Sequence, residues 1–274
     1  MTTLLVQLTD THIREPGKLA YGRIDTAPYL REAVKSILRM KQPPAAVVMT
    51  GDLVDFGRPT EYAHLAELLE PLKIPVYLMP GNHDDRDALR RSFPGHTYLG
   101  TGEFLQYTVD IEGVRLLALD TSVPGRSEGM LCERRLAWLA QELQRSRGMR
   151  VIVAMHHPPF KTFIGHMDKI GLQSGSDELA ALLAKHDHVQ RVICGHLHRA
   201  IDARFGGTIA STSPSPAHQV CLDLSPDAPS MWTLEPPGFR VHVWDAEGPV
   251  VTHLAAIGDF PGPYPFHENG ALID

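Results

Sequence analysis

Short apolar runs rich in branched side chains alternate with amphipathic stretches over the first two thirds of the chain. Runs bounded by turn residues predict buried strands, and a spacing of three to four between apolar residues predicts helices. Within the stretch 25–40, Asp25 or Thr26 can cap a helix and Pro28 sits in its first turn, where proline is tolerated. We predict strands at 4–8, 45–49, 76–79, 151–155 and 191–194; helices at 25–40, 59–72, 85–93, 133–146 and 176–185; a hairpin turning at Glu112–Gly113; and one apolar helix face formed by Leu30, Val34, Ile37 and Leu38.

The pattern changes after residue 200. Alternating apolar and polar residues there predict antiparallel strands, interrupted by a Pro-rich segment at 225–238. These strands are expected at 200–212, 218–224, 238–245 and 248–254. The order of elements predicts an α/β protein of two packed sheets flanked by helices, forming one domain with an irregular C-terminal extension.

Composition excludes several classes of protein. Of the 274 residues 43% are apolar and 21% charged, which is ordinary for a globular protein. The net charge of −6, with no run of lysine or arginine, argues against a nucleic-acid polymer or an anionic membrane as partner. The first residues lack a basic region and Asp10 breaks their apolar run, so we expect neither a signal peptide nor a membrane anchor. Three cysteines without a CxxC motif suit a reducing, cytoplasmic location.

The chain has 15 histidines, and several of them follow strands. Five predicted strands are each followed by a polar cluster, namely Asp10-Thr11-His12, Gly51-Asp52-Leu53-Val54-Asp55, Gly81-Asn82-His83-Asp84, His156-His157-Pro158-Pro159 and Gly195-His196-Leu197-His198. Each cluster alone is no more than a turn signal. Five in series are different, because turn formation does not select aspartate, asparagine and histidine together. Since ligands of α/β sheets bind beyond the carboxyl ends of strands, we expect these clusters to converge.

The converging side chains form a candidate set of metal ligands. Carboxylate, amide and imidazole groups without a thiolate suit Mn, Fe, Zn or Co. The set is too large for one ion and fits two divalent ions that share a bridging carboxylate. Only two carboxylates would balance two such ions, so the centre stays positive and favours an anion such as a phosphate ester. The candidate ligands are Asp10, His12, Asp52, Asn82, His156, His196 and His198.

The succession DTH, GDLVD, GNHD, HHPP and GHLH resembles the calcineurin-like metallophosphoesterase superfamily. The surrounding text, "KLAYGRID", "GDLVDFGRPTEY", "YLMPGNHDD", "MHHPPF" and "SPSPAHQV", is similar to its bacterial phosphodiesterase branch, which includes glycerophosphodiesterases and class III cyclic-nucleotide phosphodiesterases. The resemblance covers residues 3 to 221. It implies a four-layer αββα sandwich of two mixed β-sheets, with residues 1–222 as catalytic domain and 223–274 completing that domain.

The resemblance also implies how the candidate ligands are divided. One ion would be held by Asp10, His12, Asp52 and His198, and the other by Asp52, Asn82, His156 and His196, with Asp52 bridging. Asn82, His83 and His218 would contact the substrate. His157 would be a neighbour of His156 rather than a ligand. We expect Asp55 to orient His83 as the acid of a catalytic dyad.

The substrate is expected to be a small phosphodiester, such as 3′,5′-cAMP or a glycerophosphodiester. Members that are protein phosphatases carry GDxVDRG and GNHE, whereas this chain has Phe56 and Asp84 at the arginine and glutamate positions. A monoester dianion gains most from a guanidinium clamp, although Arg58 and Arg86 lie nearby in sequence. The implied mechanism is in-line attack by a metal-bound hydroxide, with His83 assisting the leaving group.

Three alternatives stay open at this point. One is another enzyme of the superfamily, a phosphomonoesterase or a nuclease. The second is a non-enzymatic, metal-dependent scaffold, and the third is a structural metal site, which would usually be closed and four-coordinate.

Two Pro- and aromatic-rich segments, 225–238 and 259–267, need a separate interpretation. Each can be a surface-hugging tail, a lid over the site or an arm onto a second subunit. Trp232, Phe260, Tyr264 and Phe266 would be costly to leave in water. We therefore expect packing against the mouth of the site or against another protomer of a homo-oligomer.

Overall fold

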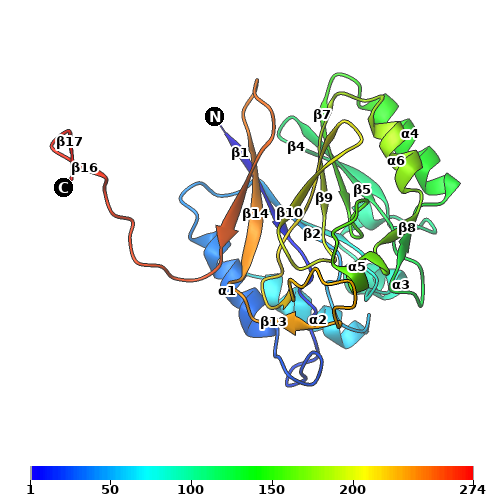
Figure 1. Ribbon diagram of the computed structural model, residues 1–274, viewed down its shortest axis with the longest axis horizontal. Coiled ribbons are helices and arrows are strands. Elements are labelled where there is room, and N and C mark those ends of the chain that lie inside the picture. Colours follow the sequence, from blue (N-terminus) through cyan, green and yellow to red (C-terminus); the bar gives the residue numbers. More distant parts are fainter. Residues whose placement is uncertain (1, 274) are drawn as a thin grey trace.

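Two β-sheets pack face to face in the computed structural model, which describes residues 2–273 (Figure 1). The first sheet has five strands in the order β15-β14-β1-β2-β3. β1 to β3 are parallel, and β14 joins them as the antiparallel neighbour of β1. Their bounds are β1 (Thr3–Leu8), β2 (Ala46–Thr50), β3 (Val76–Met79), β14 (Gly238–Trp244) and β15 (Val251–Ala256).

The second sheet has six strands in the order β10-β11-β9-β7-β5-β4. The four central strands are parallel, and each edge strand is the antiparallel arm of a hairpin. The bounds are β4 (Tyr107–Ile111), β5 (Val114–Leu119), β7 (Arg150–Met155), β9 (Val189–Cys194), β10 (Ile201–Phe205) and β11 (Thr208–Thr212).

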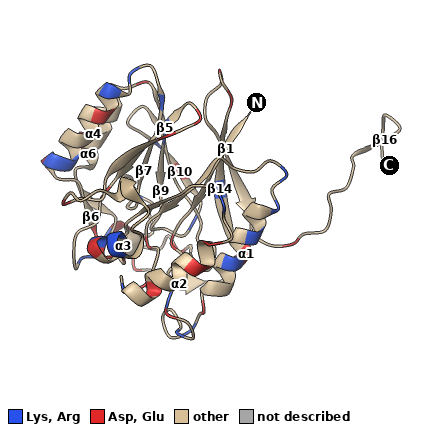
Figure 2. Cartoon of the chain, turned by 180° about the vertical axis from the view of Figure 1, so that it is seen from behind, with Lys and Arg blue, Asp and Glu red and all other residues tan. Residues whose placement is uncertain are grey.

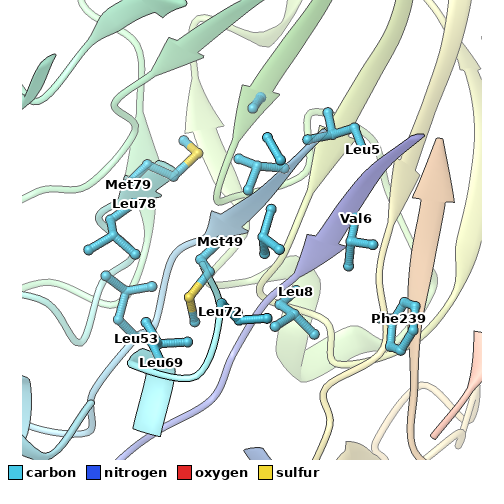
Figure 3. Packing of buried hydrophobic residues seen from close by; sticks show 14 of the residues in the cluster. Leu5, Val6, Leu8, Met49, Leu53, Leu69, Leu72, Leu78, Met79 and Phe239 are labelled. Atoms are coloured by element: carbon cyan, nitrogen blue, oxygen red, sulfur yellow. The ribbon is translucent and has the colours of Figure 1, made fainter. Parts of the chain in front are cut away.

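Helices cover the outer face of each sheet, as predicted for an αββα sandwich. α1 (Ala27–Leu38), α2 (Pro59–Leu69) and α3 (Arg86–Ser92) belong to the core cluster of the first sheet. α4 (Glu133–Arg145) and α6 (Ser176–Leu183) cover the second sheet. Side chains of β7 alternate between the layers: Ile152 and Ala154 face the first sheet, while Val151, Val153 and Met155 face these two helices. Figure 3 shows how side chains of β1, β2 and β14 pack in the first cluster.

Most predicted elements form within a few residues of their expected bounds, but two expectations were wrong. Leu38 lies outside the buried face of α1 and is 55% exposed, because the helix ends there and Leu30, Val34 and Ile37 already fill the contact with the sheet. The strand expected at 218–224 is only β12 (Gln219–Val220), which pairs with β13 (Trp232–Thr233) from the Pro-rich segment.

Several short elements carried no clear sequence pattern. They are the 3₁₀ turn Thr97–Leu99, β6 (Gly129–Met130), α5 (Gly165–Asp168), β8 (Leu172–Ser174), β16 (His267–Glu268) and β17 (Ala271–Leu272).

At the start of α1 the two candidate caps, Asp25 and Thr26, make different hydrogen bonds. Asp25 Oδ1 accepts a hydrogen bond from Ala27 N (3.1 Å), while the hydroxyl of Thr26 donates to the carbonyl of His12 (2.9 Å).

A buried polar side chain connects the two sheets. Gln7 of β1 donates from Nε2 to the carbonyl of Cys194 on β9 (2.9 Å) and to Thr50 Oγ1 on β2 (3.1 Å). Its Oε1 lies 3.2 Å from His242 Nε2 on β14, and His242 Nδ1 lies 2.9 Å from Thr252 Oγ1. Both ring nitrogens of His242 and both ends of the Gln7 amide thus have partners in a region that excludes water.

The chain after β15 runs away from the body of the molecule (Figure 1). Its large apolar side chains are open to solvent: Phe260 is 64%, Tyr264 75% and Phe266 80% exposed.

Lys, Arg, Asp and Glu are interspersed over the outer helices (Figure 2). None of the helices within residues 2–273 combines the length and apolar character that a membrane crossing would need.

Candidate metal centre

The structure brings the seven candidate ligands to one end of the sandwich. β1, β2 and β3 of the first sheet lead into Asp10–His12, Asp52 and Asn82, and β7 and β9 of the second lead into His156 and His196–His198. Six of the seven are buried, with exposed fractions of 0–6%, and Asn82 is partly buried. The expectation that the five clusters converge is therefore confirmed.

The backbone at the centre is held in an unusual conformation. Five of the seven candidate ligands have positive φ angles: Asp10 (51°), His12 (44°), Asp52 (48°), His196 (70°) and His198 (52°). This left-handed region is uncommon for residues other than glycine, and its cost persists only where surrounding contacts enforce it. The chain turns abruptly after each strand and aims these side chains at a common point.

Glycines in the motifs allow close approach between the turns. A Cβ on Gly195 would lie 2.1 Å from Thr9 Oγ1 and 2.9 Å from Asp10 Oδ2. A Cβ on Gly81 would lie 2.2 Å from Asp52 Oδ1. Any side chain at either position would therefore displace a candidate ligand or a group that supports one.

Nitrogen and oxygen atoms face one another on the His12 side of the centre. His12 Nε2 lies 3.2 Å from His198 Nε2 and 3.7 Å from Asp52 Oδ2. His198 Nε2 is in turn 3.4 Å from Asp10 Oδ1. Four side chains from both sheets thus present donor atoms to one small volume.

A second group of donor atoms adjoins the first through Asp52. His156 Nε2 lies 3.4 Å from Asp52 Oδ2 and 3.1 Å from Asn82 Oδ1. The ring of His196 lies 5.1 Å from that of His156, and its buried Nε2 has no hydrogen-bond partner among the described residues. Asp52 Oδ2 is therefore shared between the two groups, while its Oδ1 accepts a hydrogen bond from His83 N (2.9 Å).

Hydrogen bonds behind the imidazoles fix which nitrogen faces the centre. His156 Nδ1 donates to the carbonyl of Thr50 (2.8 Å), and His198 Nδ1 donates to the carbonyl of His218 (3.0 Å). His12 Nδ1 donates to Asp55 Oδ1 (3.2 Å). In the neutral rings each Nε2 then carries a lone pair, which is the usual state of a histidine that binds a metal.

These features fit a pair of divalent ions. Two Nε2 lone pairs 3.2 Å apart repel each other unless a proton or a metal cation lies between them. Burial, with the carboxylate of Asp52 close by, raises the pKa of Asp10 to about 6, and a cation bound beside it would favour its charged form. Burial alone would lower the pKa of His156, but the negative charge of the nearby Asp52 raises it to about 9. The surroundings of His156 therefore favour a positive charge. The donor set contains no thiolate and suits first-row metals.

His157 lies beside His156 and His196 in a group of side chains that could hold an ion, but both of its ring nitrogens have other partners. Its Nδ1 accepts a hydrogen bond from Thr121 Oγ1 (2.8 Å) and its Nε2 donates to the carbonyl of Ser127 (3.1 Å). Burial and the neighbouring His196 hold the pKa of His157 well below its usual range. This neutral ring supports the loop at Ser127 and packs against its neighbour His156 (4.8 Å between ring centroids).

His83 and His218 both line the cavity above the centre, as expected of substrate-facing residues, but Asp55 has a different main contact. His83 Nδ1 donates to the backbone carbonyl of Asp55 (2.8 Å), whereas the Asp55 carboxylate is 3.6 Å away. That carboxylate is closer to His12 Nδ1 (3.2 Å) and also accepts from Arg14 Nη1 (3.3 Å). The carboxylate therefore mainly orients the candidate ligand His12, and a peptide carbonyl orients His83.

The cavity also contains residues that the sequence motifs did not identify. It has a volume of about 220 Å³ and is lined in addition by Tyr21, Ser127, His166, Met231 and Trp232. Tyr21 belongs to the quoted "KLAYGRID" text, and Trp232 was expected at the mouth of the site or against another protomer, whereas Ser127 and His166 stand in no motif. Neither Arg58 nor Arg86 lines this cavity: Arg58 pairs with Glu15 (3.2 Å), and Arg86 makes two hydrogen bonds to Asp120 (2.6 and 3.1 Å).

Comparisons with known proteins agree with this geometry. The family described as calcineurin-like phosphoesterase matches residues 3–200. The probable glycerophosphodiester phosphodiesterase GpdQ of Arcobacter nitrofigilis is 40% identical over 272 residues, which cover 99% of this chain and 100% of that protein. The 3′,5′-cyclic adenosine monophosphate phosphodiesterase CpdA of Pseudomonas aeruginosa is 30% identical over 261 residues, covering 94% and 91% of the two chains.

Solved structures of more distant proteins share the fold. A purple acid phosphatase from yellow lupin superposes with a TM-score of 0.68 at 14% identity, covering 100% of this chain and 53% of that one. A dimetal phosphatase from Danio rerio superposes with a TM-score of 0.62 at 16% identity, covering 93% and 99%. The predicted four-layer sandwich is thus a known architecture.

The contact between Asp55 and His12 predicts the effect of Asp55→Asn. An amide in this position holds His12 less firmly, so we expect metal affinity to fall about 10- to 100-fold, as for other partners of ligating histidines. Titration of chelator-stripped protein with Mn²⁺, followed by calorimetry, measures this directly. Asp110→Asn, which breaks an exposed pair with Arg115, is the matched control. Unchanged Mn²⁺ affinity in Asp55→Asn would show that the carboxylate does not support His12.

Proposed function

The chain belongs to the calcineurin-like phosphoesterase family, and from this premise we propose that it is a metal-dependent phosphodiesterase acting on small phosphodiesters. The observation that carries the proposal is the shared group of buried donor atoms around Asp52 Oδ2, which opens into a cavity lined by His83 and His218. Glycerophosphodiesters and 3′,5′-cyclic nucleotides are the candidate substrates, because relatives named for both activities match nearly the whole chain.

We propose that the donor atoms hold two ions. Contacts on the His12 side favour one ion held by Asp10, His12, Asp52 and His198. Contacts around His156 favour a second ion held by Asp52, Asn82, His156 and His196. Fe, Mn, Zn and Co all suit this set, and elemental analysis of the purified protein decides among them.

The charge of the cavity favours a diester over a monoester. Among the described lining residues there is no lysine or arginine, so a phosphate dianion would find no guanidinium clamp. Asp84, at the position of the phosphatase glutamate, accepts hydrogen bonds from Leu53 N, Gly81 N and the Tyr62 hydroxyl. Asp84 thus holds the turns between motifs. A singly charged diester needs only the metal centre and the cavity histidines.

The residues have separate tasks in hydrolysis. When bound, the ions lower the pKa of coordinated water and polarise the phosphoryl oxygens. The hydrogen bond at Nδ1 orients the ring of His83 and leaves Nε2 available to the substrate. In the protonated ring, Nε2 can donate its proton to the departing alkoxide. Burial and the nearby His12 lower the pKa of His218 to about 3, so this ring stays neutral and can hydrogen-bond the substrate but not supply the proton.

The proposal is tested by the ratio of two initial rates. Chelator-stripped protein with added Mn²⁺ should hydrolyse bis(p-nitrophenyl) phosphate faster than p-nitrophenyl phosphate, and activity should fall when the chelator is restored. 3′,5′-cAMP and glycerophosphocholine are then compared. A preference for the monoester would favour a phosphomonoesterase, and no hydrolysis by protein with two bound ions would favour a scaffold.

Substitution of His83 should separate leaving-group assistance from metal binding. In His83→Ala we expect kcat for 3′,5′-cAMP, whose alkoxide leaves poorly, to fall about 100-fold or more. The rate for bis(p-nitrophenyl) phosphate should fall much less, because nitrophenolate needs no proton. His253→Ala, at an exposed position on β15, is the control. Equal losses on both substrates with full metal content would remove His83 from this role.

We also propose that the exposed C-terminal segment packs against a second copy of the chain. Phe260, Tyr264 and Phe266 are 64–80% exposed, and burial of such rings is strongly favourable. Sedimentation equilibrium should therefore give a multiple of the 30.3 kDa chain mass, and removal of residues 259–274 should shift it toward the monomer. A monomeric full-length chain at micromolar concentration would contradict this.

A further inference from the structure

One side of the cavity is an aromatic wall, formed by Tyr21, His218 and Trp232. The ring centroids of Tyr21 and Trp232 are 5.8 Å apart, and the ring of His218 lies 5.5 Å from Trp232 and 5.1 Å from Tyr21. The wall adjoins the metal centre, since His218 is 4.5 Å from the ring of His198 and 5.5 Å from that of His12.

Polar residues also line the cavity and adjoin a different part of the centre. The carbonyl of Ser127 accepts from His157, whose ring is 4.7 Å from that of His196. His166 lines the cavity as well, and its Nδ1 has no hydrogen-bond partner among the described residues. A bound diester therefore meets an aromatic environment beside His12 and His198 and a polar one beside His196.

Trp232 is placed in the wall by its backbone. β13 pairs with β12 so that Trp232 lies opposite Val220, and Cys221 N donates to the carbonyl of Met231 (2.9 Å). Part of the indole packs against Ala20, Ile24 and Ala217, while the residue remains half-buried and lines the cavity. The ring is thus held in place before any substrate binds, which limits the entropy lost on binding.

We propose that Trp232 is a specificity-determining residue, whose indole stacks against a planar base carried by one ester group of the substrate. This inference rests on the proposed function and narrows its substrate class to phosphodiesters of nucleosides. Aromatic side chains at such positions bind bases through their faces, and the contribution tolerates different bases. A glycerol group has no flat surface and gains little from the same wall.

The charges around the wall favour a neutral base over a cationic head group. Aromatic walls can also bind quaternary ammonium groups. Among the described residues that line the cavity, however, Asp52 is the one carboxylate, and it belongs to the metal centre. The remaining neighbour of the wall, His218, is an imidazole, which supplies no negative charge in either protonation state. A choline group would therefore find no anionic partner there.

The test compares two diesters in Trp232→Leu, Trp232→Phe and wild type. For 3′,5′-cAMP we expect Trp232→Leu to raise KM about tenfold with kcat within about twofold, and Trp232→Phe to retain most of the affinity. KM for glycerophosphocholine should change less than about twofold. Trp138→Leu is the matched control, because Trp138 is also partly buried but lies on α4 and packs against the core cluster of the second sheet.

A binding measurement separates this inference from the proposed function. Adenosine carries the base without a phosphate, so its binding to wild type, followed by calorimetry, needs no hydrolysis. Trp232→Leu, checked for an unchanged melting temperature, should lose this binding. Equal KM changes for both diesters, a larger change for glycerophosphocholine, or undiminished adenosine binding would each overturn the role of Trp232. Absence of any diester hydrolysis in a wild type that still binds adenosine through Trp232 would instead overturn the proposed function and leave the base-binding wall standing.

Discussion

The hydrogen bonds of Gln7 join the two sheets directly beside the metal centre. The candidate ligands come from both sheets, so the distances between their donor atoms depend on how the sheets are placed relative to each other. Gln7 lies three residues before Asp10 and bonds to the carbonyl of Cys194, two residues before His196. It also bonds to Thr50, whose own carbonyl holds His156. Apolar packing is tolerant of sliding, whereas a buried amide that loses a partner costs about 1–3 kcal/mol.

The same end of the sandwich stores conformational strain. Left-handed backbone at residues such as Asp10 and Asp52 costs about 1–3 kcal/mol each, and the apolar layers beneath supply the stability that offsets it. The turns are held by hydrogen bonds to ligand atoms themselves: His196 N donates to Asp10, and His83 N donates to Asp52. Each carboxylate therefore fixes a neighbouring turn as well as presenting an oxygen to the centre. The fold and the site are stabilised by one set of contacts.

This coupling explains which features could be predicted from the sequence. A strand followed by Asp, Asn or His marks both the end of an element and a candidate ligand, so the pattern predicted the layers and the convergence together. The partner of Asp55 could not be predicted, because its carboxylate reaches His12 across the chain while only its carbonyl faces His83. Leu38 was misassigned because apolar spacing does not show where a helix loses contact with the sheet. Ser127 reaches the cavity on an irregular segment and His166 on the four-residue α5, and neither segment is long enough to show a periodicity.

The chemistry and the selection of substrate come from different parts of the chain. The family match ends at residue 200 and contains all seven candidate ligands and His83. His218 and Trp232 lie beyond it, on segments tied together by the short pairing of β12 with β13. This pairing involves few backbone bonds and can change in sequence without disturbing either large sheet. His218 and Trp232 thus stand beside a centre built inside the family match, and the side chain at position 232 would set the balance between cyclic nucleotides and glycerophosphodiesters in this chain.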